Sequence, residues 1–360
     1  MIPRLFEKTA TTFTNYGICP LVDADRCIVT EVRNGEFTLE LNYPRDGQWA
    51  EQITVDRIIL ADPRDNASAQ PFRIYSVEYD MNGDLVARAQ HISYQLNSII
   101  IGANWQNPGS RYPSKFWEKE TQNKLSASNP FSFSTDVDDE NDPVHQYGCT
   151  EATPLRTLLG GMEGSMLDLY GGEFEWDGYT VKLWKARGSN NGVKIAYTKN
   201  LTGLNYSIDL SDVYTGVVAY WSSGGVYVQS DLQTTANSYS FSRDIAVDAT
   251  TEFDTQPTKA QLNTWASAYV ANAPTPKVSI EVEFVPLWQT EEYKDFYGLE
   301  HVSLCDTVEA IYPPLGLDVS AKVVETIYNV LADRYDEITI STVRSDISDT
   351  IFALIKEAEK

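Results

Sequence analysis

Apolar and polar residues alternate strictly after Gly35, from Phe37 to Tyr43. A period of two residues is typical of a β-strand with one face in a core and the other in water. Asn34-Gly35 separates this run from an earlier one that starts at Cys27. A type I′ hairpin turn needs positive φ at both central residues, and Asn-Gly supplies it at low cost. The pattern therefore predicts a β-hairpin with an Asn-Gly turn.

A second hairpin pattern of the same kind follows in the sequence. The alternating runs Phe72–Tyr79 and Leu85–Ala89 flank the pair Asn82-Gly83. Two consecutive hairpins, each with an apolar and a polar face, indicate a small antiparallel barrel or sandwich. We assign this first β module to residues 1–96.

An α+β region is predicted for residues 97–205. A short amphipathic helix covers 113–124 with Ser114 as its N-cap, and Thr153-Pro154 opens a second helix. A third hairpin lies within 172–184 around Asp177-Gly178.

A second β module is predicted for residues 206–345. It contains a hairpin within 213–229, a helix near 258–270 and a strand over 278–284. In the helix, Leu262, Trp265 and Tyr269 form the apolar stripe. Residues 346–360 are predicted to form a C-terminal helix capped by Ser348.

The second module echoes the first. Asp306-Thr307-Val308 parallels Asp56-Arg57-Ile58, and 321–328 parallels 72–79 at a similar spacing. An internal duplication is a fair hypothesis, although any two alternating strands resemble each other. The fold class predicted from these patterns is α+β, mainly antiparallel β.

Charge is the most unusual feature of the composition. The 360 residues carry a formal net charge of -23, which disfavours nucleic-acid binding. Ordinary solubility is the commoner explanation of such a surface in acidic proteins. No apolar run approaches 18 residues and the N-terminus has no apolar signal segment, so neither a membrane span nor secretion is predicted.

Cysteine and histidine are few. Four scattered cysteines form no CxxC pair and are expected to be reduced and buried; they are Cys19, Cys27, Cys149 and Cys305. His91 is expected to be a structural histidine at the end of a strand. His145 and Cys149 are four residues apart, but a zinc site would need distant partners.

Two acidic clusters are candidates for chemistry. Glu173, Glu175 and Asp177 share one strand face, as a glycosidase pair would, although a solvated face is the simpler explanation. The alternating acids at 136–142 suggest a calcium loop, yet Asn141 stands where the turn needs Gly and Tyr147 where Glu is needed. Aromatic residues are abundant and suit either a β core or the binding of wall sugars. The sequence thus predicts no catalytic residue, no cofactor site and no metal site.

One stretch carries a family resemblance. The runs VTEVRNGEFTLELNYPRDG, AEQITVDRII, FRIYSVEYD and VARAQHISYQL resemble the N-terminal region of phage tail-tip hub proteins. These are also called tail-associated lysins or prophage endopeptidase tail proteins, and they are related in fold to baseplate hubs. The similarity is specific over residues 20–100 and continues loosely through LTGLNYSIDLSDVYTGVVAYW to the C-terminal strands.

The resemblance implies two tail-tube-like β-barrels per chain, with the α+β region inserted between them. It implies a non-enzymatic homotrimer in the tail tip of a virion, made in the host cytoplasm. Its expected partners are the distal tail ring protein, the tape-measure protein and phage DNA that passes through the channel without specific binding. The alternatives are a tail-associated cell-wall hydrolase and a module that binds carbohydrate of the host wall.

Overall fold

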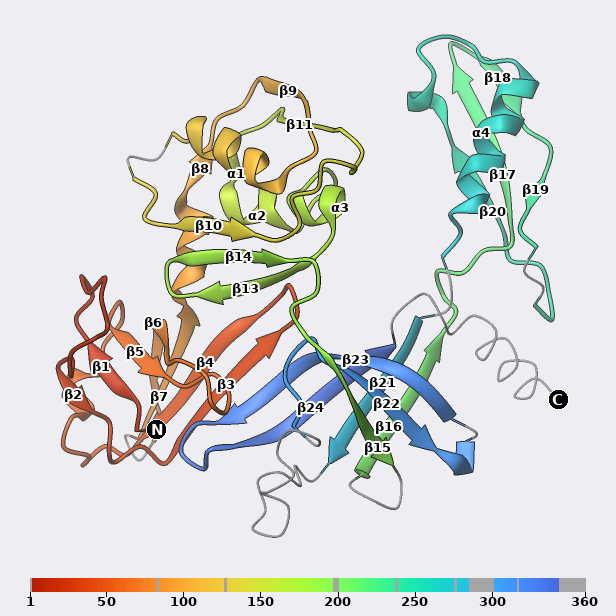
Figure 1. Ribbon diagram of the computed structural model, residues 1–360. Coiled ribbons are helices and arrows are strands. Elements are labelled where there is room, and N and C mark those ends of the chain that lie inside the picture. Colours follow the sequence, from red (N-terminus) through yellow and green to blue (C-terminus); the bar gives the residue numbers. More distant parts are fainter. Residues whose placement is uncertain are drawn as a thin grey trace. The chain divides into compact units, whose positions relative to one another are not determined.

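The computed structural model describes residues 2–81, 84–125, 128–196, 201–236, 239–274, 277–284, 301–315 and 317–342 (Figure 1). The chain divides into two compact units. The first combines Met1–Leu204 with Glu281–Ile340, and the second takes in Asn205–Ile280. The four-part division predicted from the sequence is finer and stays a prediction. Its last part, residues 346–360, lies outside the described residues, as does the Asn82-Gly83 turn.

The first β module contains the two hairpins that the alternation predicts. Its strands are β1 (Arg4–Phe6), β2 (Cys19–Pro20), β3 (Arg26–Val32), β4 (Phe37–Tyr43), β5 (Ile58–Ala61), β6 (Gln70–Tyr79) and β7 (Leu85–His91), with 3-10 turns η1 (Ala50–Gln52) and η2 (Ile92–Ser98). Every second residue of β4 is buried, as expected. The type I′ prediction is wrong for the first turn, because only Asn34 of its two central residues has a positive φ, 56°.

The region that follows is a small α+β layer. It consists of β8 (Ile100–Ile101), β9 (Trp105–Ser110), α1 (Pro113–Gln122), β10 (Ser132–Thr135), β11 (His145–Cys149), β12 (Thr153–Pro154), α2 (Leu155–Leu159), α3 (Met166–Tyr170), β13 (Glu173–Asp177) and β14 (Thr180–Trp184). The two helices that the sequence predicts here, α1 and α2, have other N-cap residues than expected. Tyr112 is the N-cap of α1, and the amide of Ser114 donates instead to Asp138 at 3.1 Å. Pro154, and not Thr153, is the N-cap of α2.

The remaining strands of the large sheet lie beyond this layer in the sequence. They are β15 (Asn190–Ala196), β16 (Leu201–Asp209), β21 (Lys277–Phe284), β22 (Thr307–Tyr312), β23 (Leu317–Asn329) and β24 (Arg334–Thr342), with the 3-10 turn η6 (Pro313–Leu315). The long strand β23 pairs with β22 through its first half and with β3 through its second. Both modules therefore share one sheet of the order β16-β21-β24-β23-β3-β4-β7-β6-β5-β1-β2, in which β22 also pairs with β23, and β15 pairs with β22.

The second unit has a sheet covered on one face by a helix. It comprises β17 (Gly216–Ser223), β18 (Val226–Gln229), β19 (Gln233–Thr234), β20 (Asp244–Asp248), η3 (Thr250–Glu252) and α4 (Lys259–Ala271). The helix near 258–270 is confirmed, and Thr258 caps it through a capping box with Gln261. Its buried residues are Leu262, Ala266 and Val270, so the buried face is rotated from the predicted stripe.

The strand order of the shared sheet repeats. Strands β4, β7, β6 and β5 lie in the same order as β21, β24, β23 and β22. At matching places, Asp56 and Cys305 have positive φ and donate their amides to Ile74 and Val323. Cys305, and not Asp306, is therefore the counterpart of Asp56, and the predicted alignment is off by one residue at this strand.

The fold is mostly β with few helices. Its strand pairs are of mixed type, since β10–β14, β15–β22 and β17–β20 are parallel. Among the helices of the described ranges, none is long and apolar enough to cross a bilayer.

Candidate functional site: a buried charge cluster

Glu173 lies where three segments of the first unit meet. Its Oε1 is 2.5 Å from Nζ of Lys322 on β23 and 2.9 Å from Nε of Arg33, just after β3. Its Oε2 accepts the amide of Arg187 at 2.7 Å. The side chain of Glu173 is only 2% exposed, so the expectation of a solvated strand face is wrong here.

The surroundings keep this carboxyl ionised. Burial raises the pKa of Glu173, but the hydrogen bonds from Lys322 and the Arg187 amide, with the charges of Lys322 and Arg33, outweigh it. The pKa therefore lies below its ordinary value.

A second buried carboxylate adjoins the first. Glu31 of β3 is 2% exposed, and its oxygens lie 2.8 Å from Nη2 of Arg187 and 3.2 Å from Nη1 of Arg64. Sequence reasoning missed this residue. The signal was available, because Glu31 falls on the strand face of Cys27 and Val29, where a charge must be paired.

The other two acidic side chains of β13 also form hydrogen bonds and ion pairs. Glu175 accepts from Nε1 of Trp184 at 2.7 Å and faces Arg64 at 3.6 Å. Asp177 pairs with Lys182 at 2.8 Å and accepts from Gln70 at 3.1 Å, and these contacts outweigh burial and lower its pKa. A general acid needs a raised pKa, whereas the pKa of Glu173 and that of Asp177 are both lowered.

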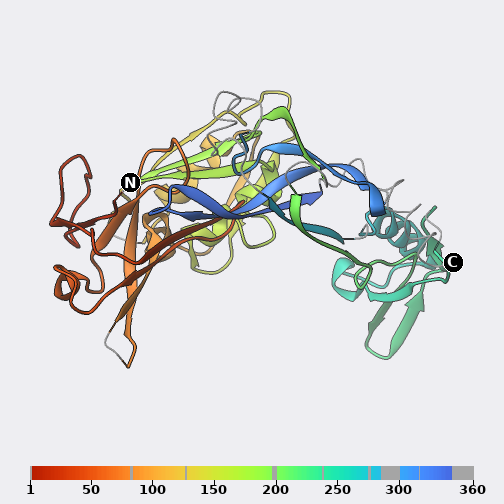
Figure 2. The same cartoon turned by 90° about the horizontal axis from the view of Figure 1, so that it is seen from below.

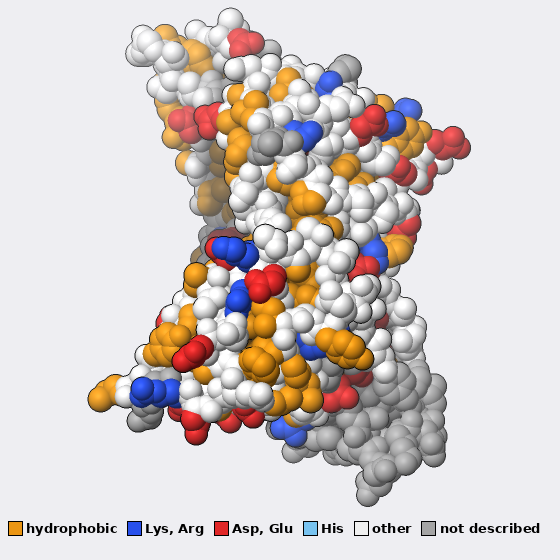
Figure 3. Space-filling model, turned by 90° about the vertical axis from the view of Figure 1, so that its left-hand side faces the viewer, with side chains coloured by type: hydrophobic (Ala, Val, Ile, Leu, Met, Phe, Trp, Pro, Cys, Tyr) orange, Lys and Arg blue, Asp and Glu red, His pale blue; other side chains and the backbone are white. Residues whose placement is uncertain are grey.

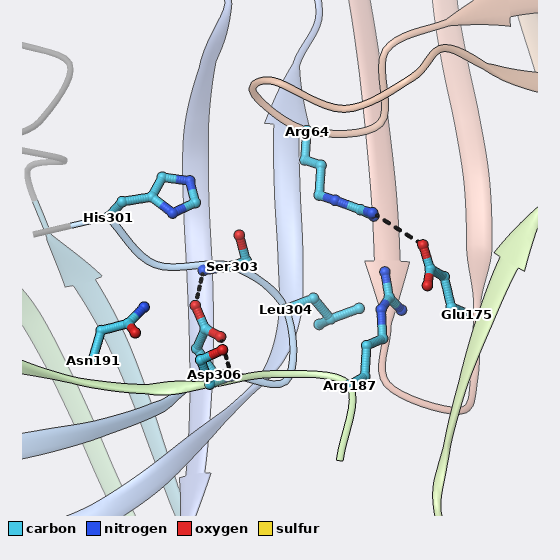
Figure 4. A pocket seen from close by; sticks show the side chains of 9 residues that line it. Arg64, Glu175, Arg187, Asn191, His301, Ser303, Leu304 and Asp306 are labelled. Atoms are coloured by element: carbon cyan, nitrogen blue, oxygen red, sulfur yellow. Dashed lines mark hydrogen bonds and ion pairs between the residues drawn. The ribbon is translucent and has the colours of Figure 1, made fainter. Parts of the chain in front are cut away.

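A polar cavity of about 340 Å³ opens beside the cluster (Figure 4). Arg64 points across it toward Glu175, with Arg187 close by. The carboxylate of Asp306 is held by the amides of Ser189 and Ser303 at 2.7 and 2.8 Å. The residues that line the cavity are Arg64, Glu175, Arg187, Ser189, Asn191, His301, Ser303, Leu304 and Asp306.

Two further contacts fix the α+β layer to the first β module. Asn34, in the β3–β4 turn, donates to the carbonyl of Gly172 at 3.1 Å and accepts the amide of Phe174 at 2.7 Å. The guanidinium of Arg156 on α2 stacks between the rings of Tyr94 and Trp176, at 4.1 and 4.5 Å.

Three acids of the stretch 136–142 accept hydrogen bonds from separate protein donors. Asp136 accepts the amide of Lys185 at 2.6 Å, Asp138 holds Ser114, and Asp139 accepts the amide of Asn141 at 2.9 Å. In the parts of the chain that the structure describes, no three His, Cys, Asp or Glu side chains gather as metal ligands.

The cysteines and His91 are structural. All four cysteines are free and buried, as predicted. His91 ends β7, is fully buried and stacks on Phe37 at 4.5 Å, and burial lowers its pKa to about 3. His145 packs edge-on against Tyr170, at the opposite end of β11 from Cys149.

Comparison with known proteins agrees with this architecture. Residues 189–351 match the model of the prophage endopeptidase tail family. No curated protein matches the chain. The resemblance to phage tail proteins is confirmed, by the family match for these residues and by the structural likenesses that follow.

Three solved structures share the fold. Prophage tail protein gp18 from Listeria monocytogenes EGD-e has 15% identity and a TM-score of 0.59, over 100% of both chains. The 43 kDa tail protein of prophage MuSo2 from Shewanella oneidensis has 12% identity and a TM-score of 0.55, over 90% of this chain and 95% of that one. A tail protein from Neisseria meningitidis MC58 has 10% identity and a TM-score of 0.53, over 90% and 93%. At these identities the likeness establishes the fold alone.

Proposed function

We propose that the chain is a structural component of a phage or prophage tail, the hub that closes the distal end of the tail tube. The family match over residues 189–351 is the observation that carries this proposal. The fold shared with three prophage tail proteins supports it. In this role the protein forms a homotrimer that contacts the distal tail ring protein and the tape-measure protein, and it opens a channel for DNA.

The repeated strand order supports the trimer. Each chain carries the order β4-β7-β6-β5 and its counterpart β21-β24-β23-β22. We propose that these are two barrel-like modules, so that three chains present six similar units around the axis. The buried charge cluster then has a structural role: it ties β3, β13 and β23 together within the chain.

An acidic channel lining is part of the proposal, because a net charge of -23 per chain repels DNA that passes. The face in Figure 3 carries acidic and basic side chains interspersed. We therefore do not assign the lining to that face.

The proposal is tested by light scattering across protein concentrations. A stable species near three times 40.4 kDa, with a ring visible by electron microscopy, is the expected result. If the chain neither assembles alone nor binds purified tail-tube components, the proposed hub function is wrong. We assign no enzymatic role, and a zymogram on host cell wall tests that point: clearing would favour the hydrolase.

A further inference from the structure

Two tyrosines occupy equivalent places in the repeated sheet but differ in exposure. Arg73 pairs with the first residue of β5, and Lys322 pairs with the first residue of β22. Tyr79 and Tyr328 each follow six residues later. Tyr79 is 65% exposed, whereas Tyr328 is fully buried.

The equivalence holds across an irregularity that both strands share. In β6 the pairing with β7 shifts register between Ile74 and Ser76. In β23 the alternation of buried and partly exposed residues shifts by one position at the matching place, between Val323 and Thr326. Because both strands shift together, Tyr79 remains the counterpart of Tyr328.

Tyr328 has a neighbouring strand that Tyr79 lacks. Residues 325–329 of β23 pair antiparallel with 28–32 of β3, which places Tyr328 opposite Val29. In β6, the corresponding residues 76–79 pair with β7 on one edge. On their other edge, no strand of the described ranges pairs with them.

This open edge belongs to a hairpin that projects from the sheet (Figure 2). Met81 near its tip is fully exposed, and Tyr75 is 53% exposed. An edge strand that carries exposed apolar side chains is a template for pairing with another chain.

The sheet also contains the strand that such an edge would need. β3 lies beside β4, and in the repeat β16 lies beside β21, so β16 is the counterpart of β3. Within the part of the chain that is described, β16 ends the sheet, and β21 is its single strand neighbour. Within the described ranges, one chain thus has a β23-like edge without a strand partner and a β3-like strand that pairs on one edge.

We propose that these two edges bind each other between copies of this chain. Residues 76–79 of one copy pair antiparallel with β16 of the next, as 325–329 pair with β3 inside each chain, and Tyr79 becomes buried. The contact joins two different surfaces, so repetition closes a ring when the rotation per copy allows it. This inference rests on the proposed hub assembly, because the number of copies comes from there.

The Tyr79→Asp variant tests the contact. Tyr79 is largely exposed within one chain, so the variant is expected to fold with unchanged circular dichroism. A charge introduced into the buried edge is expected to raise the dissociation constant of the assembly by about tenfold or more, measured by light scattering. Tyr227→Asp is the matched control, because this tyrosine also lies on a strand and is 57% exposed. It is expected to leave assembly unchanged.

Hydrogen exchange of the wild-type chain supplies a second readout. On assembly, peptides that contain residues 76–79 and β16 are both expected to gain protection. If the assembly forms without this protection, or if Tyr79→Asp assembles as the wild type does, the proposed edge contact is wrong. Neither result contradicts the proposed hub function. If the wild-type chain stays monomeric, the proposed contact between copies is wrong. The hub proposal is then tested separately, by mixing the chain with purified tail-tube components.

Discussion

Two buried glutamates show how surroundings decide the state of the same side chain. Glu173 is surrounded by cations and has a lowered pKa. Glu120, on α1, is fully buried, and neither carboxyl oxygen has a hydrogen-bond partner. Desolvation alone raises the pKa of Glu120 to about 8. The first carboxylate stabilises the fold when ionised, and the second destabilises it.

Glu120 makes stability fall as pH rises. Its folded pKa of about 8 exceeds the ordinary 4.5, so between these values the unfolded chain is ionised while the folded one stays protonated. Stability is expected to drop by about 1.4 kcal/mol per pH unit over this window. Urea unfolding at pH 5 and pH 8 measures the slope, and Glu120→Gln is expected to remove this contribution. Glu118→Gln, on the exposed face of α1, is the control, and an unchanged slope in Glu120→Gln contradicts the assignment.

Glu173→Gln is expected to destabilise the protein at pH 7 by about 3 kcal/mol, because it leaves Lys322 and Arg33 without their carboxylate. A lowered pKa means that this stability is present above the ordinary pKa of Glu and is lost as pH falls through the folded value. The difference from the wild type should therefore shrink in acid. Glu309→Gln, in an exposed pair with Lys194, should cost less than about 0.5 kcal/mol. Equal losses in the two variants, measured by urea unfolding, would argue against the buried cluster.

At the scale of elements, local patterns and distant pairings differ in how well sequence predicts them. Alternation and turn residues predicted the β3–β4 and β13–β14 hairpins, because both strands of a hairpin lie in one short window. The pairing of β23 with β3 joins residues about three hundred positions apart, and no local pattern specifies it. Arg187 and Lys322 belong to the charge cluster only through such pairings, so the cluster was not predicted. The repeat was visible, but an alignment by residue type paired Asp56 with Asp306, whereas backbone conformation pairs it with Cys305.

The Asn34 side chain is a point of contact between two hairpins. Asn34→Gly keeps a residue that tolerates positive φ but removes the bonds to Gly172 and Phe174. We expect a loss of about 1–2 kcal/mol, with faster hydrogen exchange at the Phe174 amide. Asn104→Gly is the control, since Asn104 also has positive φ, 62°, and is exposed. If exchange at Phe174 does not change, the side chain of Asn34 does not hold the β13–β14 hairpin in place.

At the scale of the whole molecule, the repeat explains where the second unit enters the chain. In the first module β3 and β4 are joined by a turn of four residues, 33–36. Their counterparts β16 and β21 are neighbours in the sheet, yet residues 210–276, all of which belong to the second unit, lie between them in the sequence. The second unit thus occupies the position of a hairpin turn, and an insertion at such a turn costs the sheet little.

Excision of the second unit tests this account. A chain in which Asn-Gly replaces residues 210–276 should keep the β16–β21 pair, because both strands remain and the new turn suits a hairpin. We expect the shortened chain to fold, with circular dichroism of a β-rich protein and the same number of copies per assembly as the full chain. A soluble shortened chain that no longer assembles would place the second unit in the contacts between copies. One that does not fold would show that β16 and β21 depend on the second unit, which would contradict its placement at a turn.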